Sequence, residues 1–124
     1  MKKTLSLNIG TFYIHDNYLI AEIKEGTTIN VDSNGILEDI SKNYYASKKF
    51  VYITNRVNSY AVDPAVYIKT SEIENLIGFA VVANTRVALS NAEIERLFLK
   101  KPFEIFRELD KAKAWAESII KENE

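Results

Sequence analysis

Three strand ends in this sequence carry a polar step that contains an arginine. The steps follow hydrophobic runs at 50–54, 76–83 and 103–106. In a parallel sheet the carboxyl ends of the strands share one edge, and the amides at the starts of the following helices point to that edge. The guanidinium group is planar and carries five donors, which suits phosphate or carboxylate. We therefore predict a small-anion site made from Arg56, Arg86, Arg107, Asn55, Asn84, Thr85 and Ser90.

The same arginines also have a simpler interpretation. They are then solvated loop residues that pair with nearby acids such as Asp63 or Glu108. Strand order decides between the two interpretations, because only neighbouring strands bring such groups within about 10 Å of each other. The sequence does not fix that order, so both interpretations stay open.

Five of the seven tyrosines fall within residues 44–67. Tyrosine is common at recognition surfaces because its ring is apolar and its hydroxyl group is polar. Tyr44, Tyr60 and Tyr67 are therefore candidates for an interaction surface, provided that they are exposed together. The alternative is a set of tyrosines at the edge of the core, with hydroxyl groups that reach water.

The sequence shows no catalytic set. Its single histidine, His15, falls in a predicted turn, without the partners that nucleophilic catalysis requires. Glu93 and Glu95 are two apart in a predicted helix and so face different ways, which argues against a carboxylate pair. There is no cysteine, which excludes disulfides, thiol catalysis and zinc held by cysteine. We predict a non-enzyme with no catalytic residue, no metal site and no cofactor.

Length and charge narrow the class of protein. The 124 residues predict one domain, spanning 1–124, that needs no metal or disulfide to stabilise its core. Sixteen basic and seventeen acidic residues give a net charge of −1, so we expect no nucleic-acid partner. The uncharged stretch 75–85 is too short to span a membrane. With no cysteine, these features predict a cytoplasmic protein.

The elements that position the candidate residues follow from hydrophobic periodicity, which predicts the order β-β-α-β-α-β-α-β-α. Apolar residues alternate over 5–14 and change phase at Gly10, which predicts one strand with a bulge. A second strand at 18–24 forms a hairpin with it, across the turn signal at 15–17. Apolar residues at helical spacing over 36–44 predict the first helix.

The second half alternates strands with helices. Residues 50–54 and 76–83 are typical of interior strands, and Gly78 predicts the close approach of another group. Asp63-Pro64 predicts the start of a short helix between these strands. The next helix starts near Asn84 or at Ser90, and a short strand and a final helix follow it. The apolar positions of that third helix are Ile94, Leu97 and Phe98.

These elements predict an α/β fold. Its sheet is a single layer, mixed and mostly parallel, with about five strands, about four helices and an N-terminal β-hairpin. The first strand lies antiparallel at an edge.

One part of the chain resembles the SpoIIAA-like branch of the STAS domains (sulphate transporter and anti-sigma-factor antagonist). The resemblance is best over 76–120. It is carried by Gly78-Phe79-Ala80-Val81-Val82-Ala83-Asn84-Thr85-Arg86, by Lys101-Pro102-Phe103-Glu104-Ile105-Phe106 and by Leu109-Asp110-Lys111-Ala112-Lys113-Ala114-Trp115. The resemblance implies the SpoIIAA-like fold and a regulatory role through a protein partner.

Antagonist members of that family carry an Asp-Ser-Ser-Gly-like motif whose serine is phosphorylated. The matching stretch here is Val62-Asp63-Pro64-Ala65-Val66. The aspartate is present, but proline and alanine stand where the serines would be, and neither has a hydroxyl group. The phosphorylation switch therefore does not carry over to this chain.

The leading hypothesis is a non-enzymatic regulatory or binding module that acts through a protein partner or a small anionic or apolar ligand. An alternative is a carrier of a small lipid or anion. It predicts an apolar cavity between the helices and the sheet, lined by residues such as Phe98, Phe106 and Tyr67. A second alternative is an enzyme that uses the strand-end arginines on a phosphorylated small molecule. Edge strands also allow a homodimer.

Overall fold

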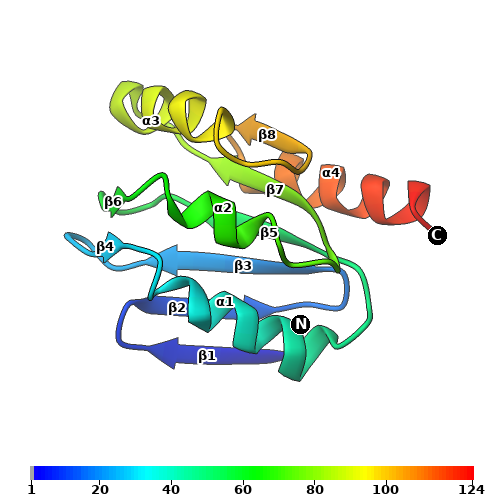
Figure 1. Cartoon of the computed structure of the whole chain (residues 1–124). Coiled ribbons are helices and arrows are strands. Elements are labelled where there is room, and N and C mark those ends of the chain that lie inside the picture. Colours follow the sequence, from blue (N-terminus) through cyan, green and yellow to red (C-terminus); the bar gives the residue numbers. More distant parts are fainter. Residues whose placement is uncertain (1) are drawn as a thin grey trace.

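A six-stranded sheet forms the centre of the fold (Figure 1). The computed structural model describes residues 2–124. The strands lie in the order β1-β2-β3-β5-β7-β8. Their bounds are Lys3–Leu7 for β1, Gly10–Ile14 for β2, Tyr18–Ile23 for β3, Phe50–Asn55 for β5, Leu76–Val82 for β7 and Phe103–Phe106 for β8. The first three strands are antiparallel neighbours, and β3, β5, β7 and β8 are parallel.

Four α-helices and a second, small sheet complete the structure. The helices are α1 (Asn34–Ile40), α2 (Val66–Thr70), α3 (Arg86–Arg96) and α4 (Leu109–Glu122). The first of them continues into a π-helical turn, η1 (Ser41–Tyr45). The small sheet pairs β4 (Thr28–Ile29) with β6 (Ala61–Val62) in parallel. No helix within residues 2–124 combines the length and the apolar character needed to cross a membrane.

The N-terminal strand prediction was wrong in one respect, because residues 5–14 form two strands rather than one bulged strand. Leu7 pairs with Gly10, so the chain reverses at Asn8 and Ile9 and adds a sixth strand to the sheet. A Cβ atom at Gly10 would overlap the carbonyl oxygen of Glu22 on the next strand. The phase change at Gly10 therefore marks a turn followed by a close backbone approach.

The alternation of side chains along the strands divides the core into two layers. On one face, residues such as Leu19, Phe50 and Phe79 meet α1, α2 and α3. On the other face, residues such as Val51 and Ala80 meet α4 alone. In Figure 1, α1 and α2 cross the face of the sheet that is turned toward the viewer. The sheet therefore has three short helices on one side and one long helix on the other.

The strand β7 confirms the prediction of an interior strand. Six of its seven residues are buried, and it pairs with β5 and β8. A Cβ atom at Gly78 would overlap the Ile119 side chain and lie 3.0 Å from the ring of Trp115. The missing side chain therefore lets α4 lie close to the sheet.

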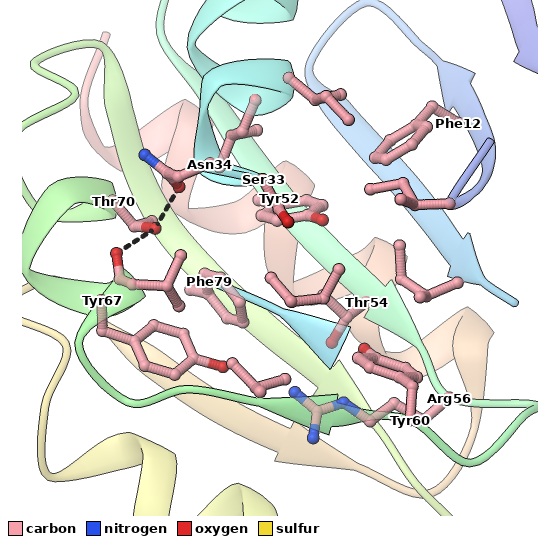
Figure 2. Close-up of a pocket in the computed structure, with 17 residues that line it drawn as sticks. Phe12, Ser33, Asn34, Tyr52, Thr54, Arg56, Tyr60, Tyr67, Thr70 and Phe79 are labelled. Carbon is pink, nitrogen blue, oxygen red and sulfur yellow. Dashed lines mark hydrogen bonds between the residues drawn. The ribbon is translucent and has the colours of Figure 1, made fainter. Parts of the chain in front are cut away.

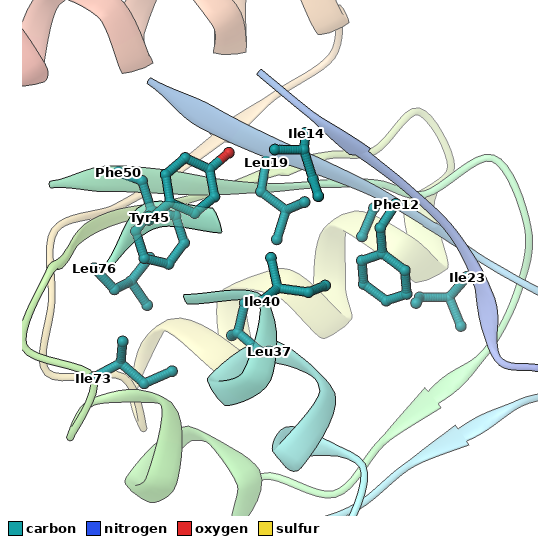
Figure 3. Close-up of a cluster of buried hydrophobic side chains, with 11 residues drawn as sticks. Phe12, Ile14, Leu19, Ile23, Leu37, Ile40, Tyr45, Phe50, Ile73 and Leu76 are labelled. Atoms are coloured by element: carbon teal, nitrogen blue, oxygen red, sulfur yellow. The ribbon is translucent and has the colours of Figure 1, made fainter. Parts of the chain in front are cut away.

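The η1 turn anchors the cluster under α1, which Figure 3 shows. The ring of Tyr45 stacks on Phe50 at 4.3 Å between centroids. Its hydroxyl group donates to the carbonyl oxygens of His15 and Tyr18, each 2.8 Å away. Burial raises the pKa of Tyr45 above its ordinary value. The tyrosine thus fixes the β2–β3 turn to the helix layer.

The buried face of α3 differs from the predicted one. The helix starts at Thr85, whose side chain accepts a hydrogen bond from the amide of Ala88, so the earlier of the two predicted starts is correct. The three residues predicted to form its apolar side are all exposed: Ile94, Leu97 and Phe98. The inner side carries Ala92 and Glu95 instead. This helix packs against the edge strand β8, where small side chains allow close contact.

Candidate functional site

A cavity of about 50 Å³ lies between the sheet and the layer formed by α1 and α2 (Figure 2). Residues of β2, β3, β5 and β7 line the cavity on the side of the sheet, and α1 and α2 cover the opposite side. The small β4–β6 sheet closes one side. Its walls are mostly apolar or aromatic, and the lining residues include Phe12, Ile23, Ile29, Leu37, Tyr52, Val62, Val66, Tyr67 and Phe79. This is the general character of a small-molecule site.

Aromatic contacts centred on Phe79 build the wall on the side of β7. Its ring meets Tyr52 edge-on at 5.1 Å and Tyr67 edge-on at 5.6 Å, and it stacks on Phe103 at 5.3 Å. Tyr52 and Phe79 are paired across β5 and β7, so the sheet register places them side by side. Such ring pairs stabilise the wall beyond the area that they bury.

A hydrogen-bonded clamp joins α1 and α2, the two helices that cover the cavity. The Thr70 hydroxyl group lies 2.8 Å from the side-chain oxygen of Asn34 and 3.1 Å from the carbonyl oxygen of Val66, and donates to them (Figure 2). Asn34 in turn donates to Glu38 at 3.2 Å. Asn34 and Thr70 are buried, so this clamp satisfies polar groups that would otherwise be costly inside the protein.

A buried ion pair lies at one end of the cavity. Arg56, just after β5, binds Glu95 of α3 through both terminal nitrogens. One of these contacts joins Nη1 to Oε2 at 2.6 Å, and the other joins Nη2 to Oε1. Each side chain is only 7% exposed. Tyr67 of α2 donates its hydroxyl hydrogen to the same carboxylate. The cluster therefore ties β5, α2 and α3 together.

Burial and charge act on the titratable groups of this cluster. Burial lowers the pKa of Arg56, but the hydrogen bond to Glu95 and the neighbouring groups raise it by more, so Arg56 stays charged. Burial raises the pKa of Tyr67 well above its ordinary value, and the Glu95 carboxylate raises it further. The cluster is therefore an ion pair supported by a neutral phenol.

One N–H donor of the Arg56 guanidinium group takes no part in the ion pair with Glu95. This Nε is buried and meets no acceptor with good hydrogen-bond geometry within residues 2–124, although the Tyr60 side chain interacts with Arg56 beside it. The guanidinium carbon lies 5.3 Å from the centroid of the Tyr60 ring, which covers it. Figure 2 shows the Arg56 side chain running beside Tyr60 along the cavity, with its guanidinium end toward Tyr67. An unused buried donor in a cavity wall is a feature that requires an explanation.

Arg56 and Tyr60 also line a larger cleft of about 450 Å³. Segments 25–28 and 57–61 and the first turns of α3 form this cleft. Its lining includes hydroxyl and amide side chains such as Thr85 and Asn91. The two residues shared by the cavity and the cleft therefore form a wall between them.

The structure meets the strand-order condition for the predicted anion site, because β5, β7 and β8 are neighbours. It does not bring the three arginines into one set. Arg56 is paired with Glu95, and Asn55 points to the other face and donates to Glu22 at 3.0 Å. Thr85 caps α3. The four remaining candidates are exposed: Asn84, Arg86, Ser90 and Arg107. Neither Asp63 nor Glu108 is the partner of Arg56.

The three tyrosines predicted as a surface are not exposed together. Tyr67 is 2% exposed and belongs to the cavity, as does the partly buried Tyr60. Tyr44 packs against the separate cluster under α1. Of the residues predicted to line an apolar cavity, only Tyr67 does so. Phe98 is exposed, and Phe106 packs on Trp115 at the α4 face.

Glu95 is the important site residue that the sequence prediction missed. From the sequence, Glu95 is a candidate only as a partner of Glu93. A usable signal was present, because Glu95 is in helical phase with Ala88, Ala92 and Leu99. A charged residue in phase with small apolar residues indicates a buried, paired carboxylate. Within residues 2–124, no group of three or more side chains suited to a metal ion comes together.

A comparison with solved structures shows which known fold this architecture resembles. The fold is similar to the crystal structure of an uncharacterized protein of the DUF3478 family, with a SpoIIAA-like fold, from Shewanella loihica PV-4. The TM-score is 0.56, and the match covers 92% of this chain and 90% of that chain. This chain has a SpoIIAA-like fold.

The fold implied by the resemblance of 76–120 is thus confirmed. The two sequences are 9% identical, so the likeness concerns the fold alone. No model of a known protein family and no curated protein matches the sequence.

Proposed function

We propose that this SpoIIAA-like domain is a non-enzymatic binding module that holds a small, largely apolar ligand in the cavity between the sheet and the α1–α2 layer. The observation that carries the proposal is the composition of the cavity wall. Apolar and aromatic side chains form most of it, and the polar side chains among them are few. Walls of this kind bind ligands by burying apolar surface, with the polar groups fixing orientation.

The size of the cavity sets the scale of the ligand. An apolar cavity of about 150 Å³ binds benzene or xenon. The cavity here, at about 50 Å³, holds only a few non-hydrogen atoms. The ligand is therefore either very small or inserts one small group while the rest lies outside.

Xenon tests this proposal because it enters dry apolar cavities. We expect xenon to shift the amide NMR resonances of residues around the cavity, with a saturating dependence on pressure. In Val66→Leu the added methylene group fills part of the cavity, so the shifts should become several-fold smaller. The matched control is Val87→Leu, the same change at an exposed position. Equal shifts in all three proteins, or none in the wild type, would contradict the proposal.

A second candidate function is regulation through a protein partner, which the STAS resemblance implies. The observation that favours it is the outer side of α3 and of the turn that follows it, where four apolar residues are all exposed: Val87, Ile94, Leu97 and Phe98. The simplest partner is a second copy of the chain. Sedimentation should then show a dimer that Leu97→Glu dissociates, whereas a monomer at every concentration would argue against self-association.

A further inference from the structure

We infer that the ligand is an uncharged molecule that presents one hydrogen-bond acceptor, of the carbonyl type, to Nε of Arg56. This inference deepens the proposed function and rests on it. It adds the chemical class of the ligand and the residue that selects it. Three observations carry it: the geometry of the ion pair, the charge of the cavity wall and the unpaired donor.

The geometry of the ion pair leaves one edge of the guanidinium group unused. Glu95 occupies the edge formed by Nη1 and Nη2. The N–H of Nε belongs to a different edge of the same plane, which can donate to an oxygen atom. Nε is buried and unpaired within residues 2–124, in a side chain that lines the cavity. A ligand oxygen at this edge would satisfy it.

The charge of the cavity favours a neutral ligand over an anion. Arg56 is the one charged side chain among the described residues that line the cavity, and Glu95 already balances its charge. A ligand carboxylate would lose its hydration and would lie close to Glu95, with no second cation to compensate. A carbonyl oxygen accepts the same hydrogen bond without that cost.

The rest of the ligand skeleton must be apolar. Phe79, Tyr52 and Val66 surround the remaining space. The small volume restricts the inserted group to a few atoms, as argued above. A short ketone, amide or ester group on an apolar skeleton meets all of these conditions.

Three probes with the same five-atom skeleton separate these contributions: butanone, propionate and 2-methylbut-1-ene. Butanone carries a neutral acceptor, propionate a charged one, and the alkene none. Because the donor is a charged group, the hydrogen bond should make butanone bind roughly 10- to 150-fold more tightly than the alkene in an NMR titration. Propionate should bind more weakly than butanone. Equal affinities for butanone and the alkene, or a preference for propionate, would overturn the inference.

Two variants keep the test independent of simple folding defects. Glu95→Gln removes the balancing charge and keeps the side-chain shape, so the preference should reverse toward propionate. The double change Arg56→Met with Glu95→Met removes the donor and both charges. It should bind the alkene as before and lose the preference for butanone. Retention of that preference in the double variant would exclude Arg56 as the donor.

The outcomes also distinguish this inference from the proposed function. If xenon and all three probes leave the resonances around the cavity unchanged, the cavity is not a binding site and both ideas fail. If xenon and the alkene bind but butanone gains nothing, the cavity binds apolar molecules and only the role of Arg56 fails.

Discussion

The Arg56–Glu95 pair should show a large asymmetry between losing one partner and losing both. Each side chain is 93% buried, because each is 7% exposed. Arg56→Met leaves the Glu95 carboxylate buried with only the Tyr67 hydroxyl group as a partner. Removing one member of a buried pair costs about 3–5 kcal/mol, because the other charge stays uncompensated.

The size of this effect makes it easy to measure. The unfolding entropy of a 124-residue domain is roughly 0.26 kcal/mol/K, at about 2.1 cal/mol/K per residue. A loss of 3–5 kcal/mol should therefore lower the melting temperature by about 11–19 °C. The double change to Met at both positions removes both charges but leaves the buried Tyr67 hydroxyl group without its acceptor, so it should cost about 1–3 kcal/mol, less than either single change.

Urea unfolding followed by circular dichroism at pH 7 measures all of these free energies. Comparable m-values are needed, because a changed m-value would mean a changed denatured state. The reasoning is refuted if each single change costs less than about 1 kcal/mol. That result would mean that water screens the pair as it screens a surface salt bridge.

Three further predictions concern close packing, pH and the anion site. Gly78→Ala should destabilise the fold by about 1–3 kcal/mol in urea unfolding, because the new Cβ atom overlaps side chains of α4. The control is Gly35→Ala, which has open space around it and should be neutral or stabilising. Similar values for the two would contradict the close approach. Burial raises the pKa values of Tyr45 and Tyr67 in the folded protein, whereas tyrosines in the unfolded chain ionise near pH 10. Below about pH 10, the free energy of unfolding should therefore not change with pH through these two groups. Above about pH 10 it should fall by up to about 1.4 kcal/mol per pH unit for each tyrosine. The fall should be shallower in Tyr45→Phe, and an unchanged slope would argue against a buried phenol. If the exposed strand-end arginines hold an anion, phosphate at a hundred times its dissociation constant should raise the free energy of unfolding by about 2.7 kcal/mol. Arg86→Ala should abolish this gain. A wild-type protein whose stability does not change with phosphate would contradict the prediction.

The parts of the fold predicted correctly are those with strong local signals. The strand β7 is a continuous apolar run, and Gly78 is a position where a side chain cannot fit. Both features follow from residues close together in the sequence. The N-terminal hairpin was misjudged because a phase change at a glycine indicates a bulge and a tight turn equally well. Only the pairing of Leu7 with Gly10 separates the two.

The site was harder to predict, because its parts are distant in the sequence. Arg56 and Glu95 are 39 residues apart, and no local pattern joins them. The face of α3 was misassigned because the large residues Ile94 and Leu97 suggest a core. This helix packs through small residues such as Ala92 at an edge strand, and it leaves its larger residues outside. Which face a short helix buries depends on its neighbour.

The single helix on the second face of the sheet has a consequence for the folding of the protein. α4 alone covers that side of β3, β5, β7 and β8. It follows all of these strands in the sequence, so one side of the sheet stays uncovered until this helix has docked. A folding intermediate in which α4 has not docked therefore displays a continuous apolar surface built around Val51, Ile53 and Ala80. Exposed apolar surface of this kind makes a folding intermediate prone to aggregation, so docking of α4 is the step that protects the domain.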